Sequence, residues 1–118
     1  MDGKQWEKLV KLIEQIDLSY ALSHLRHTPS EHTLKLKEKL KKQLESLDEQ
    51  DLKTLYVYYI IGESYASKTP SKELLLNRVA VASKNYARSI TMEKLLRKEN
   101  LEPVLLRGKY LIDLTKKG

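Results

Sequence analysis

The sequence contains no cysteine. Disulfide bonds, a thiol nucleophile and a cysteine-based zinc site are therefore excluded. The sequence also shows no charged and then apolar leader, and no apolar run approaches the length of a membrane span. We therefore expect a cytoplasmic protein that makes no membrane contact.

Signatures of catalysis are equally scarce, because no nucleophile elbow, phosphate-binding loop or pair of catalytic carboxylates can be recognised. His24, His27 and His32 lie close together, and Glu31 is nearby, so a zinc site could be drawn among them. A third ligand would have to come from across a loop, and no second cluster supplies a fourth. We predict no metal, no cofactor, no small-molecule substrate and no enzymatic activity.

What the chain does contain is lysine, glutamate, leucine, isoleucine and tyrosine, with few glutamines, asparagines and methionines. This composition favours a thermophilic source. A length of 118 residues indicates one domain with a core of its own. The apolar spacing predicts an all-α bundle of about five helices, with a small β-hairpin at the C-terminal end.

The positive charge is unevenly distributed along the chain. Residues 1–67 carry ten Lys or Arg and eleven Asp or Glu, whereas residues 68–118 carry twelve and five. The net charge is therefore −1 in the first part and +7 in the second. Such asymmetry indicates a polyanionic partner, nucleic acid before a membrane surface. The alternative is a helical protein that is basic without a nucleic-acid partner.

Residues 1–67 read as a helical bundle. A first helix over residues 2–25 is predicted by an apolar stripe, in which Asp17 and Ser19 mark a kink or a second cap. The stripe is also the candidate interface if the protein dimerises, and it consists of Trp6, Leu9, Val10, Ile13, Ile16 and Tyr20. Thr28 is the predicted N-cap of the second helix, with Pro29 at its first position and Glu31 completing a capping box.

The second helix extends to about residue 47, with leucines on one face and mostly lysines on the other. Asp48 and Asp51 then predict the start of a third helix. Between Leu52 and Gly62 this helix has almost no polar face, so we expect it to be buried as the central element. Its tyrosines are expected to pack in the core and not to stack on bases.

Residues 68–118 form the basic part. Thr69-Pro70-Ser71 repeats the capping pattern seen at residue 28 and opens a fourth helix. Its expected inward residues are Leu74, Leu75, Val79, Ala82 and Tyr86. Ser89 or Thr91 is expected to cap a fifth helix, and Asn100 is expected to terminate it in the left-handed conformation.

Residues 103–114 admit two interpretations. As a helix opened by Pro103, they place Leu105, Gly108 and Ile112 on one side. As a hairpin, residues 104–106 pair with residues 110–112 across a turn in which Gly108 takes the positive φ. A helix must tolerate this glycine at about 1 kcal/mol relative to alanine, so we expect the hairpin.

Residues 91–113 resemble the recognition helix and wing of excisionase-like, MerR-type winged-helix DNA-binding domains. A Thr-capped helix with Leu95-Leu96 is followed by Leu101, Val104 and a hairpin that ends in Tyr110-Leu111-Ile112-Asp113. Val81-Ala82 also falls where the preceding helix of that family often has Val-Ala. The family's turn glycines are replaced by Tyr86 and Glu99, and residues 1–67 lie outside the match.

The resemblance implies an accessory or regulatory protein that binds duplex DNA without catalysis. Its contacts to phosphates and bases would come from the fifth helix and the wing, namely Arg88, Lys94, Arg97, Lys98, Arg107 and Lys109. The alternative is a helical adaptor or small subunit, encoded by a phage or mobile element, that binds another protein, since packing alone can explain every helix.

Overall fold

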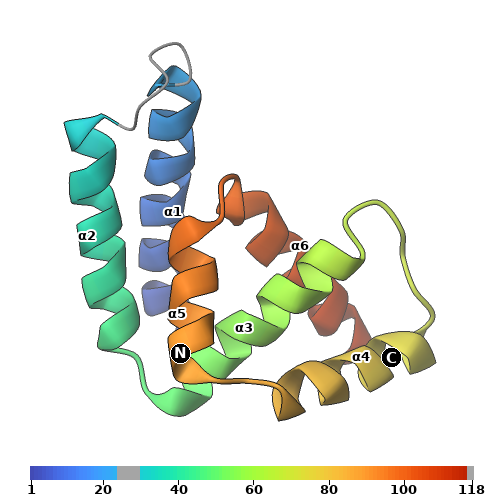
Figure 1. Cartoon of the computed structure of the whole chain (residues 1–118). Coiled ribbons are helices and arrows are strands. Elements are labelled where there is room, and N and C mark those ends of the chain that lie inside the picture. The colour runs from blue at the N-terminus through green and yellow to red at the C-terminus, as the bar shows by residue number, and fades with distance from the viewer. Residues whose placement is uncertain (24–29, 117–118) are drawn as a thin grey trace.

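A computed structural model describes residues 1–23 and 30–116, and these residues form six α-helices and no strand (Figure 1). The helices are α1 (Gly3–Ser23), α2 (Glu31–Glu45), α3 (Glu49–Ser64), α4 (Lys72–Lys84), α5 (Arg88–Arg97) and α6 (Leu101–Lys116). The all-α prediction is confirmed. The hairpin predicted at 103–114 is wrong, and the bundle has one helix more than expected. No helix within the described ranges has the length and apolar character that would let it cross a membrane.

The helices are arranged around α3. Helices α1 and α2 lie side by side as an antiparallel pair, and α3 runs across the molecule with α6 packed against it (Figure 1). Helix α5 contacts both α2 and α3, whereas α4 lies at the edge and packs mainly on α3. One apolar cluster joins α1, α2, α3, α5 and α6, and a second joins α3, α4 and α6. The central, buried position predicted for α3 is therefore confirmed.

Helix α1 is continuous and uses its apolar stripe inside the molecule. Leu9, Ile13 and Ile16 are buried, and Trp6 and Tyr20 pack against the same core cluster. The proposed dimer interface along this stripe is therefore wrong, because these side chains already pack against the other helices. Asp17 and Ser19 do not begin a second helix, because α1 runs unbroken from Gly3 to Ser23. Their side chains bond to α6 and α2 instead.

Serine caps two of the helices. Ser30 accepts the backbone N–H of Thr33 at the start of α2, and Ser71 accepts that of Leu74 at the start of α4. In both Thr-Pro-Ser sequences the serine is thus the N-cap, which corrects the expectation that the threonine would cap and the proline would open the helix. Thr28 and Pro29 themselves lie outside the described residues. Asp48 caps α3 as predicted, through the N–H of Asp51.

Two predictions for residues 68–118 are wrong, namely the cap of the fifth helix and the inward position of Leu74. Helix α5 starts after Ala87 without a side-chain cap, and neither Ser89 nor Thr91 has that role. Thr91 lies within α5, after its first turn has begun, and its side chain is fully buried. Leu74 was expected to face inward, but its side chain is 58% exposed, because α4 buries only Leu75 and Ala82.

Gly108 explains why residues 101–116 form a helix. A Cβ atom built on Gly108 would lie 1.9 Å from the carbonyl oxygen of Tyr58, and one on Gly62 would lie 1.9 Å from that of Val104. The two glycines therefore let α3 and α6 approach each other more closely than any other residue would permit. Gly108 is needed for its missing side chain and not for a positive φ, and this close packing outweighs its low helix propensity.

Helix α6 receives its N-terminal cap from another part of the chain. Asp17 on α1 accepts the backbone N–H groups of Leu101 and Glu102, at 3.3 and 3.0 Å. These donors have no partner inside the helix, so a carboxylate there stabilises the helix start. Asn100 precedes α6 with a φ of 55°, which confirms its predicted left-handed conformation.

The glycine contact can be tested by substitution. Gly108→Ala or Gly62→Ala forces α3 and α6 apart, and we expect each change to lower the free energy of unfolding by about 3 kcal/mol or more, as measured by urea denaturation. Gly3→Ala is the matched control, since a Cβ there meets nothing within 4 Å. The control should be neutral or stabilising by up to about 1 kcal/mol. Equal effects at positions 3 and 108 would contradict this role.

Candidate interaction surfaces

The six residues predicted to bind nucleic acid do not form one surface. Arg88, Lys94 and Arg97 lie on α5, and Lys98 follows directly after it. Arg107 and Lys109 lie on α6 but on different sides of it. Arg107 contacts the segment between α3 and α4, whereas Lys109 lies over the ring of Trp6 on α1 at 5.8 Å. Because α6 is a helix and not a hairpin, these two residues do not lie beside the cations of α5.

Most of the predicted cationic side chains are held in ion pairs. Three of these pairs are Arg88 with Glu49 at 2.6 Å, Lys98 with Glu63 at 2.9 Å, and Arg97 with Glu93 at 2.9 Å. A fourth joins Lys109 to Asp113 at 2.6 Å. Lys94 makes no ion pair within the part of the chain that the structure describes. The charge offered to a partner is therefore smaller than the sequence suggests.

Arg107 has a structural role. Its Nε donates to the carbonyl oxygen of Tyr65 at 3.1 Å, and its Nη2 donates to that of Lys68 at 3.1 Å and to the hydroxyl of Thr69 at 3.3 Å. The guanidinium thus fastens the segment between α3 and α4 to α6. Its carbon also lies 5.8 Å from the centre of the Tyr110 ring.

The pKa shifts follow from these contacts. The hydrogen bond from Arg88 lowers the pKa of Glu49, and hydrogen bonds to Glu63 and Asp113 raise the pKa values of Lys98 and Lys109. Burial raises the pKa of Asp17, although its hydrogen bonds to the start of α6 act in the opposite direction. Each of these shifts follows from a contact or from burial within the fold.

The first candidate surface is a shallow depression beside α5. It has a volume of about 330 Å³, and its lining includes Lys94, Arg97 and Lys98 together with Glu93, Ile90 and Tyr59. The structure therefore brings together three of the six predicted residues. Two carboxylates share this neighbourhood, since Glu93 pairs with Arg97 and Glu63 with Lys98. The depression therefore carries three positive side chains and has two negative ones in or beside it.

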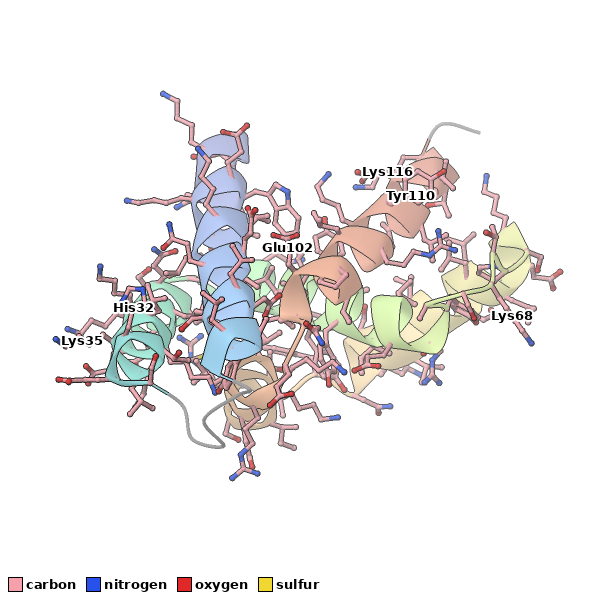
Figure 2. The ribbon with its side chains drawn as sticks, turned by 90° about the horizontal axis from the view of Figure 1, so that it is seen from above. His32, Lys35, Lys68, Glu102, Tyr110 and Lys116 are labelled. Carbon is pink, nitrogen blue, oxygen red and sulfur yellow. The ribbon has the colours of Figure 1, made fainter. Side chains whose placement is uncertain are left out.

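The second candidate surface is the outward face of α6, formed by Pro103, Leu106, Tyr110 and Leu114. The last three side chains are 41%, 55% and 43% exposed. Tyr110 projects from α6 on the side turned away from α3, as Figure 2 shows. These three residues are spaced by four, so they form a continuous ridge along the helix. A ridge of large apolar side chains without a charge among them is unusual on a solvent-facing helix.

Sequence reasoning missed the outward face of α6 because the hairpin interpretation placed its residues on two strands. A signal was present in the helix interpretation of the same residues. Leu105 and Leu111 take the buried side, and helical periodicity places Leu106, Tyr110 and Leu114 on the opposite side.

The histidines do not contribute a site in the described parts of the chain. His32 lies on α2, on the other side of the molecule from Tyr110 (Figure 2), and no three potential metal ligands come together among the residues with assigned positions. His24 and His27 lie outside the described residues.

Comparisons with family models, with curated proteins and with solved structures find no match to this chain.

The structural role of Arg107 generates a prediction. Arg107→Ala removes three hydrogen bonds, so we expect the free energy of unfolding to fall by about 1–2 kcal/mol and amide exchange to accelerate at residues 65–69. Arg97→Ala is the control, because its exposed pair with Glu93 should contribute less than about 1 kcal/mol. If both substitutions leave stability and exchange unchanged, Arg107 does not fasten this segment.

Proposed function

We propose that this protein is a non-enzymatic interaction module, an adaptor or small subunit that binds another protein chain through the outward face of α6. The ridge of Leu106, Tyr110 and Leu114 carries this proposal. A ridge with four-residue spacing is the shape that packs into the groove of another helix. Exposed apolar ridges of this kind are typical of helix-mediated recognition.

The rest of the molecule suits such a role. The outward face belongs to a helix that is anchored on its other side by Gly108, Leu105 and Leu111. It is fixed at its start by Asp17 and along its side by Arg107. A partner would therefore meet a preorganised surface and lose little conformational entropy in ordering it.

The proposal is tested by comparing two exposed positions, one on the ridge and one outside it. Tagged protein should retain a stoichiometric protein partner, either another protein or untagged copies of the chain, from an extract of the source organism. Tyr110→Glu should abolish this retention, because it places a charge in the centre of the ridge. Leu76→Glu is the control, since Leu76 is 48% exposed on α4 and lies outside the ridge. Identical retention by both variants would refute the assignment of the surface.

A second candidate function is binding to a nucleic-acid backbone through the depression beside α5. It is favoured by the three cations that line the depression, and by the net charge of +7 over residues 68–118. Phosphate contacts from Lys and Arg would suit this surface, with duplex DNA as the expected ligand.

The salt dependence of DNA binding tests this second function. Affinity for duplex DNA should fall steeply with salt, and Lys94→Glu should weaken it and reduce the slope of log K against log salt by roughly one. Lys35→Glu makes the same charge change on α2 and should have a smaller effect. Unmeasurable binding at low salt, or equal effects of the two substitutions, would exclude the α5 surface.

A further inference from the structure

The outward face of α6 has a symmetric pattern that a second copy of the chain would match. Leu106 and Leu114 lie four residues before and after Tyr110. We propose that two copies associate through α6 in antiparallel orientation, around a two-fold axis that passes beside Tyr110. This inference rests on the proposed function, for which it names the partner.

The apolar ridge is self-complementary in this arrangement. A two-fold interface requires one surface patch to match itself. With the axis at Tyr110, Leu106 of one copy packs against Leu114 of the other, and the two Tyr110 rings meet at the centre. Aromatic pairs of this kind favour offset or edge-to-face packing. Every residue of the ridge thereby finds an apolar partner.

The charges beside the ridge are also self-complementary. Lys109 and Asp113 lie on one side of it and are paired at 2.6 Å within the helix. In a two-fold antiparallel pair, the same sides of the two helices face each other. Lys109 lies one residue before Tyr110, and the antiparallel orientation brings Asp113 of the other copy to the level of three residues before Tyr110. The two side chains are therefore offset by two residues along the helix axis, about 3 Å at the rise of an α-helix. Two intrahelical ion pairs can therefore join into a four-charge network across the interface.

The opposite side of the ridge carries Arg107. Its guanidinium donates to the carbonyl oxygens of Tyr65 and Lys68, and its carbon lies 5.8 Å from the centre of the Tyr110 ring. The charge of Arg107 therefore borders the ridge but is already engaged by contacts within its own chain.

The charge balance favours a second copy over an acidic partner. Lys109 and Asp113 neutralise each other beside the ridge, whereas the cations of α5 lie on another part of the molecule. A partner therefore gains little from an acidic surface at this position. The total charge of +6 opposes association of two copies at long range, so added salt should strengthen the dimer.

Sedimentation and light scattering of the purified chain test the proposal. The ridge of one helix is smaller than the roughly 800 Å² per partner of a standard interface, so we expect a reversible dimer with a micromolar Kd. Raising the salt concentration should favour the dimer. Tyr110→Glu should give a monomer with unchanged helicity, and Leu76→Glu should dimerise like the original chain.

A charge exchange tests the orientation of the two helices. Asp113→Lys places like charges across the interface and should weaken association by roughly tenfold or more. Adding Lys109→Asp to the same chain should restore the dimer, because the exchanged pair is again complementary. Failure of this rescue would exclude the antiparallel register.

The outcomes separate this inference from the proposed function. A chain that stays monomeric, or a dimer that survives Tyr110→Glu, overturns the inference. If a monomeric chain still captures another protein in a Tyr110-dependent manner, the interaction function stands with a different partner. If Tyr110→Glu instead abolishes binding to anionic lipid vesicles while the chain remains monomeric, both the inference and the protein-binding function fail.

Discussion

The close approach of α3 and α6 is the constraint on which the rest of the structure depends. Gly62 lies against the backbone of α6, and Gly108 lies against the backbone of α3, so the contact is reciprocal and antiparallel. Helix α3 also contacts α4 and α5, so all three later helices pack on it. The same contact buries one side of α6 and turns its other apolar side towards solvent.

Much of the fold could be predicted from the sequence, because the relevant signals are local. Apolar periodicity identified α1, α2 and the buried α3, and Asp48 was recognised as the start of α3. The left-handed conformation of Asn100 was also anticipated, although α5 ends earlier than predicted, at Arg97. The hairpin prediction failed because Gly108 has two possible uses, a positive φ in a turn or a close approach between helices. Only the position of Tyr58, fifty residues away, decides between them. Local propensity cannot contain that information.

The candidate surfaces were less predictable than the fold. Counting charges along the chain cannot reveal that Arg88 pairs with Glu49, or that Lys98 pairs with Glu63, because these partners come from distant positions. It also cannot show that Arg107 binds backbone carbonyls. The outward face of α6 was hidden for a different reason, since its residues were assigned to the wrong secondary structure.

The cap that Asp17 provides to α6 has a consequence for the order of folding. The cap joins positions more than eighty residues apart, so the last helix is completed by a side chain from the first. During synthesis, α1 to α5 leave the ribosome before the helix that covers α3. The side of α3 that α6 covers then stays exposed until α6 emerges, so the core is completed only at a late stage of folding.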